Sequence, residues 1–127
     1  MEKGKKNWVF CDGYLPPKGD NPEFEGHEAL MMTNLNDEKT NIELVFVFED
    51  KDPIGGITVE LGGMRTHCVR LDMLKNAEGG PLLGIAEQYT VWSRVSCPSV
   101  HASAVWTCVR STWLTTALRA TLSKQLL

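Results

Sequence analysis

The chain has 127 residues, of which 43% are hydrophobic and 23% charged, and its formal net charge is −3. This length predicts a single domain, because compact domains typically span about 100–200 residues, and the composition excludes wholesale disorder. The acidic balance gives no basic surface for nucleic acid. Residues 1–6 are expected to be a flexible N-terminus without a signal core, and no apolar stretch approaches the about 20 residues that cross a bilayer. A soluble, cytoplasmic protein is therefore expected.

Before residue 104, apolar residues recur with period two or in short runs, which predicts strands rather than helices. Gly and Pro clusters separate these segments, and the Gly-Gly pairs at 55–56, 62–63 and 79–80 predict hairpin turns. Seven short strands with such turns predict an all-β domain over residues 7–103, either a small antiparallel β-sandwich or a small barrel. The predicted strands are 8–13, 28–33, 41–49, 56–61, 65–71, 87–96 and 99–103.

The predicted strand 41–49 is apolar on both faces between Leu44 and Phe48. One face of a small sandwich normally meets water, so this strand predicts a covering subunit and hence a homo-oligomer. Trp8 and Trp92 are expected in the core. No Cys-x-x-Cys pair is present, and the cysteines are expected to be buried small hydrophobic side chains: Cys11, Cys68, Cys97 and Cys108.

Residues 104–127 differ in composition from the rest of the chain. All sixteen Asp and Glu and ten of the thirteen Lys and Arg lie in residues 1–103, which gives a net charge of −6 there and +3 beyond. No Gly, Pro, Asp, Glu or Asn follows Ser103, and Thr and Ser alternate with bulky apolar residues. Residues 117–127 also fit a weakly amphipathic helix. We therefore treat residues 104–127 as an atypical tail.

Six blocks of sequence precede this tail in a specific order and spacing. They are WVFCDGYLPP from Trp8, EFEGHE from Glu23, NLNDEKTNIEL from Asn34, DKDP from Asp50, RTHCVRL from Arg65 and SRVSCP from Ser93. Any one block alone would be unspecific. Together they resemble the sensory rhodopsin transducer family over about residues 7–103.

The resemblance implies an antiparallel β-sandwich that assembles as a homotetramer, with no established enzymatic activity. We expect no cofactor. It also implies binding of sugars or related small polar molecules, and only some members of the family serve a membrane sensory rhodopsin. We therefore expect a non-enzymatic domain that binds a small polar ligand and passes its occupancy to a signalling partner. The alternatives are a small sugar-processing enzyme or enzyme accessory, with or without a metal, and a purely structural partner protein.

The tail departs from the family pattern, which continues with Arg-Leu-Asp where this chain has Ala104. One codon set chosen for residues 104–127, read from its third base, gives Arg-Leu-Asp-Met-Arg-Pro-Val-Asn-Leu-Ala-Tyr-Tyr, which matches the ending that the family has. Trp106 and Trp113 have single codons and fix much of this match. We therefore hypothesise that the chain is out of frame from about Ala104, through a sequencing error or a real indel.

The family motifs also supply convergent hydrogen-bonding groups for a sugar site. In the strand from Arg65 to Arg70, period two places Arg65 and His67 on one face and Arg70 on the other. An alternative is that the charged groups form buried ion pairs or interface bridges, for example Arg70 with Glu28. The motif residues expected to contact the ligand are His27, Glu28, Arg65, His67 and Arg70.

Asp12 and Tyr14 complete the candidate ligand-binding set, because they lie where a strand meets a turn and a bend would present both side chains at the rim. The alternative for Tyr14 is that it packs over Pro16. Three histidines with Glu28 invite a zinc site, but no His-x-His pair supports one, and no metal is expected. No Gly-x-Ser-x-Gly nucleophile motif and no Gly-x-x-x-x-Gly-Lys phosphate loop is present.

Overall fold

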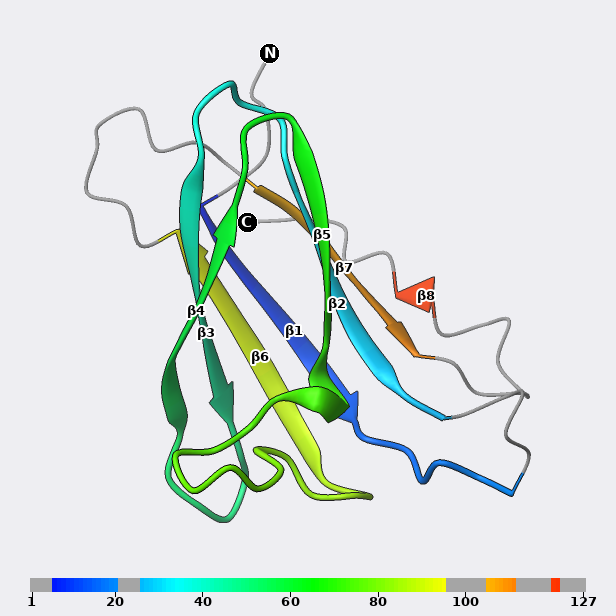
Figure 1. Cartoon of the computed structure of the whole chain (residues 1–127). Helices are drawn as coiled ribbons and strands as arrows, with labels where there is room; N and C mark the ends of the chain where they lie inside the picture. Colours follow the sequence, from blue (N-terminus) through cyan, green and yellow to red (C-terminus); the bar gives the residue numbers. More distant parts are fainter. Residues whose placement is uncertain (1–5, 21–25, 96–104, 112–119, 122–127) are drawn as a thin grey trace.

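The computed structural model describes residues 6–20, 26–95, 105–111 and 120–121, with the last two ranges described as backbone only. These residues form antiparallel strands and one short 3-10 helix, η1, at Leu71–Met73 (Figure 1). None of the described segments is a helix that is long and apolar enough to cross a membrane. The strands are β1 (Asn7–Tyr14), β2 (Glu28–Asn34), β3 (Thr40–Val47), β4 (Ile54–Leu61), β5 (Arg65–Arg70), β6 (Gln88–Val95), β7 (Val105–Ser111) and β8 (Ala120–Thr121).

The strands form two four-stranded sheets, one in the order β1-β6-β3-β4 and the other in the order β5-β2-β7-β8. The all-β fold is therefore confirmed, and six of the predicted strands are present with ends shifted by a few residues. The seventh, 99–103, lies outside the described residues, as does the predicted boundary of the tail. β7 follows that boundary and pairs with β2 from Glu28 to Asn34. Gly55 and Gly56 lie inside β4 rather than in a turn, beside a bulge in the β3–β4 ladder.

The core forms between the two sheets from side chains at alternating strand positions. On β3, Leu44 and Phe46 are fully buried and Phe48 follows at 9% exposed, whereas Val47 faces outward and is 38% exposed. Each deeply buried aliphatic or aromatic side chain of this kind contributes about 1.5–3 kcal/mol to folding. The strand is thus apolar on both faces, and the covering subunit stays a prediction.

Three outward positions differ from the expectation. Trp8 is buried and stacks on Phe10, as predicted, but the placement of Trp92 in the core was wrong. Even-numbered residues of β6 face outward, so the Trp92 ring is half-buried on the outer face and its Nε1 donates to Asn7. The burial predicted for Cys11 and Cys68 was also wrong, because both face outward and are exposed. Cys97 and Cys108 lie outside the residues whose side chains are described.

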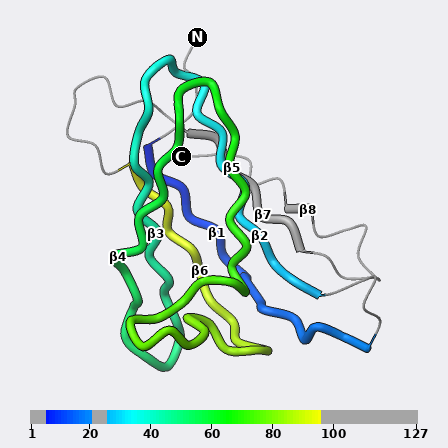
Figure 2. Tube along the Cα trace, viewed as in Figure 1, coloured from blue at the N-terminus to red at the C-terminus, as the bar shows by residue number. Residues whose placement is uncertain are grey.

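The inward side of β2 places polar residues at both ends of the strand. Glu28, Leu30, Met32 and Asn34 face the core in turn, and all four are at most 4% exposed. Glu28 lies at the end where β1 and β5 finish and β6 begins, which is the lower end in Figure 1. Residues 71–87 close this lower end by crossing from one sheet to the other (Figure 2). A polar group thus lies buried next to that crossing.

Candidate functional site

Glu28 is the centre of a buried polar network at the lower end. Its side-chain carboxylate accepts hydrogen bonds from the Tyr89 hydroxyl and, at 3.1 Å, from the backbone amide of Tyr14. Glu28 belongs to one sheet, whereas Tyr14 and Tyr89 belong to β1 and β6 of the other. We call Glu28, the Tyr89 side chain and the Tyr14 amide the base network. It joins the two sheets through a single carboxylate.

Burial is the main cause that raises the pKa of Tyr89, and the neighbouring Glu28 carboxylate raises it further. The hydroxyl therefore remains protonated and donates to Glu28. The Tyr89 ring also packs edge-to-face on Phe46, with the ring centres 5.6 Å apart. These contacts hold the ring in the core in this structure.

Gly13 provides the space for this ring. Gly13 pairs with Tyr89 in the β1–β6 ladder, and a Cβ added at Gly13 would lie 2.5 Å from Tyr89 Cε2 and 2.9 Å from the Tyr89 carbonyl oxygen. No other residue type fits without displacing the ring or the strand. The glycine is therefore required by close approach.

A β-bulge in β1 separates Gly13 from the regular part of the strand. The register shifts between Phe10 and Gly13, and Asp12 has a φ of 62°. Cys11 and Asp12 are consequently both exposed, although they are consecutive residues. Bulges of this kind redirect a side chain and are frequent beside functional sites.

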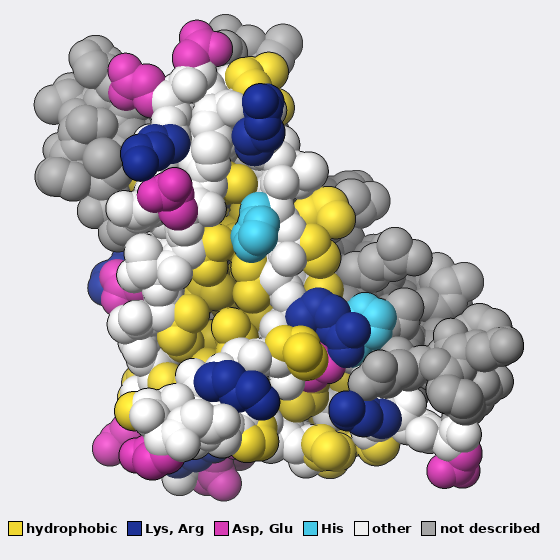
Figure 3. All heavy atoms as spheres, in the orientation of Figure 1, with side chains coloured by type: hydrophobic (Ala, Val, Ile, Leu, Met, Phe, Trp, Pro, Cys, Tyr) yellow, Lys and Arg dark blue, Asp and Glu magenta, His cyan; other side chains and the backbone are white. Residues whose placement is uncertain are grey.

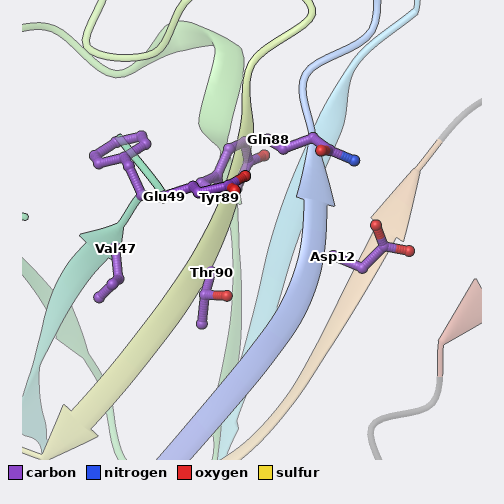
Figure 4. A pocket seen from close by; sticks show the side chains of 7 residues that line it. Asp12, Val47, Glu49, Gln88, Tyr89 and Thr90 are labelled. Carbon is purple, nitrogen blue, oxygen red and sulfur yellow. The ribbon is translucent and has the colours of Figure 1, made fainter. Parts of the chain in front are cut away.

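The redirected Asp12 lines a depression of about 460 Å³ on the outer face of the β1-β6-β3-β4 sheet (Figure 4). Pockets that bind small molecules typically have volumes of about 300–1,000 Å³. We call this feature the outer depression. Figure 4 shows Val47, Thr90 and Asp12 on three neighbouring strands, β3, β6 and β1. The lining residues are Asp12, Val47, Phe48, Glu49, Gln88, Tyr89 and Thr90.

At the lower end of the β5-β2-β7-β8 sheet, Arg70 forms an ion pair with Asp72. Arg70 Nε donates to Asp72 Oδ1 at 2.9 Å, and a second guanidinium nitrogen pairs with Oδ2. Burial alone would raise the pKa of Asp72, but the hydrogen bonds and charge of Arg70, with a smaller effect of His27, hold that pKa below its ordinary value. Arg70 is paired across the ladder with Ala29, the residue after Glu28.

Arg65 and His67 lie elsewhere on the molecule. Both lie on the face of β5 that is turned toward the other sheet, as period two predicted, because they pair with Asn34 and Met32 at the far end of β2. Their side chains are nevertheless exposed, because β5 is the edge strand of its sheet. Arg65 donates to the Met64 carbonyl at 3.0 Å. Between the edge strands β4 and β5, hydrophobic side chains are visible on the face of the molecule that Figure 3 shows.

The predicted ligand residues thus separate into two groups. Asp12, Tyr14, His27, Glu28 and Arg70 come from three strands and an adjoining turn at the lower end. Glu28 is 4% exposed, so its contacts are to the protein interior. Arg65 and His67 form the second group. Among the described residues, no three His, Cys, Asp or Glu side chains converge as metal ligands.

Sequence reasoning missed the residues that link the lower end together. Tyr89 faces inward between Glu87 and Val91, where period two alone suggests a core aromatic. Its partner Glu28 is 61 residues away in the chain, and nothing local to either residue indicates the pairing. Gln88 and Thr90 have outward positions on the same strand, and alternation alone does not show that they line a depression together with Asp12.

Comparison with known proteins agrees with this architecture. The family model described as Anabaena sensory rhodopsin transducer matches residues 3–102, and its match ends next to the change of composition at Ala104. The crystal structure of Thermotoga maritima 1070 is 28% identical, with a TM-score of 0.70 over 86% of this chain and 81% of that chain. The Anabaena sensory rhodopsin transducer is 21% identical and shares the fold, with a TM-score of 0.67 over 87% of this chain and 91% of that chain. No curated protein matches. The chain therefore belongs to the Anabaena sensory rhodopsin transducer family.

Proposed function

We propose that this protein is a non-enzymatic, cytoplasmic signalling domain that binds a small polar, sugar-like ligand in the outer depression. The observation that carries the proposal is the depression itself, which a strained bulge lines with Asp12 and which adjoins the base network. Family membership supports a signalling role. Two shared features, Tyr89 and the segment of β1 that includes Asp12 and Tyr14, connect the depression to the predicted ligand residues at the lower end.

The lining of the depression suits a ligand rich in hydroxyl groups. Among the lining residues, Asp12 and Glu49 carry carboxylates, a group that accepts hydrogen bonds, and Gln88 and Thr90 carry groups that both donate and accept. Val47 adds an apolar surface. Polar groups of this kind around a partly apolar wall fix the orientation of a sugar ring without requiring a net charge on it.

The proposed partners are further copies of the chain and a signalling protein. Val9, Trp92 and Val45 form a lateral row across β1, β6 and β3 on the outer face, and Val9 is 47% exposed. Such an apolar row supports a covering subunit in a homotetramer. The name of the family supports a membrane sensory rhodopsin as the signalling partner, with another signalling protein as the alternative.

The test is a thermal-shift assay of the protein against a panel of monosaccharides and disaccharides. A ligand at about 100 times its Kd stabilises the folded state by about 2.7 kcal/mol. We expect Asp12→Ala to abolish the shift of melting temperature, because it removes an acceptor from the depression. Thr58→Ala, an exposed change on β4 outside the depression, is the matched control and should leave the shift intact. If no sugar raises the melting temperature, or if the two variants behave alike, sugar binding in the outer depression is wrong.

A further inference from the structure

Three consecutive residues of β1 lie between the outer depression and the base network. Asp12 lines the depression. Gly13 lies against the ring of Tyr89, so closely that a Cβ would overlap it. The amide of Tyr14 donates to Glu28. We call Asp12, Gly13 and Tyr14 the bulge segment, because one stretch of backbone contacts both the outer surface of one sheet and the buried carboxylate of the other.

The bulge segment contains the irregular point of β1. The register of the β1–β6 ladder shifts between Phe10 and Gly13, Asp12 has a positive φ within that shift, and Gly13 and Tyr14 pair again with Tyr89 and Gln88. A backbone held in a sparsely populated conformation by its surroundings changes when those surroundings change. Asp12, Gly13 and Tyr14 are consecutive, so a change of backbone conformation at Asp12 would reach Gly13 and the Tyr14 amide first.

Tyr89 provides a parallel connection. It is one of the residues that line the depression, and its hydroxyl donates to Glu28. Glu28 is the first residue of β2 and follows His27. Across the ladder, Ala29 pairs with Arg70, whose guanidinium binds Asp72. The contacts thus continue from the outer face of one sheet to a charged surface of the other.

We propose that the bulge segment and Tyr89 transmit occupancy of the outer depression to the start of β2, and so change the surface around His27, Arg70 and Asp72. In one state, which the structure shows, the Tyr89 hydroxyl and the Tyr14 amide are bonded to Glu28; in the other, at least one of these bonds is released. A ligand shifts the balance by contacting Asp12 differently in the two states. The inference concerns regulation and rests on the proposed function for the identity of the site.

The experiment perturbs the depression by substitution and requires no ligand. Asp12→Gly removes the carboxylate and relieves the positive φ, and Thr58→Ala is the control on the same sheet. Hydrogen exchange of the Tyr14 amide and the amide chemical shifts of Ala29 and Arg70 are measured by NMR, in the wild-type background and in Tyr89→Phe. Glu28→Gln, which keeps the size of the side chain, serves as a second background and replaces Tyr89→Phe if that variant does not fold.

We expect Asp12→Gly to change the exchange rate of the Tyr14 amide by about tenfold, the effect of altering one hydrogen bond to a charged group. The amide signals of Ala29 and Arg70 should also shift, and the shifts should fall by at least half in the Tyr89→Phe or Glu28→Gln background. Shifts no larger than those of Thr58→Ala, or equally large in all backgrounds, would overturn the relay. A failed sugar assay would reject only the proposed ligand, since these measurements do not depend on it.

Discussion

The two ends of β2 join the same pair of sheets with different chemistry. At the upper end, the Asn34 amide donates to the Glu38 carbonyl at 2.8 Å and to the Leu61 carbonyl of β4 at 3.5 Å, and its oxygen accepts from the Asn36 amide at 3.0 Å. All these groups are uncharged. At the lower end, the Glu28 carboxylate joins the sheets by accepting hydrogen bonds from the Tyr89 hydroxyl and the Tyr14 amide. A neutral side chain is sufficient to fix an end of the strand.

The lower end uses a different kind of group for the same purpose. Burying a carboxyl group costs several kcal/mol unless hydrogen bonds offset it, and the hydrogen bonds to Glu28 include those from the Tyr14 amide and the Tyr89 hydroxyl. The outer depression adjoins those same two strands. The upper end thus joins the sheets through neutral groups, whereas the lower end joins them through the residues of the proposed relay.

The largest effect on solubility and stability is expected from β7, the neighbour of β2 on the side opposite β5. β7 belongs to the tail that we hypothesise to be out of frame, and it pairs with β2 along its full length. Residues 104–127 contain no acid, no Gly and no Pro, a composition prone to aggregation. Expressed side by side, the version with the restored family ending should be more soluble and melt several degrees higher. Equal solubility and melting would refute this consequence, and genomic DNA that encodes the written frame in independent isolates would refute the sequencing error.

Removing the Glu28 carboxyl group should lower the free energy of unfolding more than removing the Asn34 amide. Glu28→Ala removes the acceptor of the buried Tyr89 hydroxyl and of the part-buried Tyr14 amide, and we expect a loss of about 3–4 kcal/mol in the free energy of unfolding. Asn34→Ala removes only uncharged hydrogen-bonding groups, among them the donor to the Leu61 carbonyl, for an expected loss of about 2 kcal/mol. Urea denaturation of both variants measures the difference. The reverse order would contradict this comparison of the two ends.

Adding a methyl group tests the close approach at Gly13. Gly13→Ala should displace the Tyr89 ring and cost about 1–3 kcal/mol, as overpacking of a core typically does. Gly56→Ala tests a positive φ of 77° with open space around it, and is expected to cost about 1 kcal/mol. Melting temperatures of the two variants distinguish crowding from backbone strain. If Gly13→Ala melts like the wild type, the packing described for Tyr89 is incorrect.

The smallest effect concerns acid. The pKa of Asp72 in the folded state lies below its ordinary value of 3.8, so its ion pair with Arg70 stabilises the protein at pH values above 3.8 and is lost as the pH falls through the lowered pKa. Arg70 is partly exposed, so a few tenths of a kcal/mol are expected. Asp72→Asn should remove this part of the acid dependence below pH 4. An unchanged profile would mean that the pair does not contribute.

The sequence predicted most of the strands because alternation and turn residues act locally. It predicted that Arg65 and His67 share a face, which follows from period two alone. It did not predict which strands are neighbours, and so could not find that Tyr89 reaches Glu28 or that Gly13 makes space for the ring. Trp92 was misplaced for a related reason, because a bulky apolar residue at an outward position looks like a core residue until its strand has been assigned a face.

The alternation of polar and apolar residues on β2 also restricts the register that this strand can adopt during folding. Leu30 and Met32 lie between Glu28 and Asn34 on the inward side, so a slip by two residues in either direction places an aliphatic side chain where a polar one is needed. Such a slip would leave the Tyr89 hydroxyl or the Leu61 carbonyl facing a hydrocarbon group. The misregistered sheet would keep nearly all of its backbone ladder and still be penalised at one end, which depends on the direction of the slip. The spacing between Glu28 and Asn34 on β2 therefore favours one alignment of the β5-β2-β7-β8 sheet against the β1-β6-β3-β4 sheet.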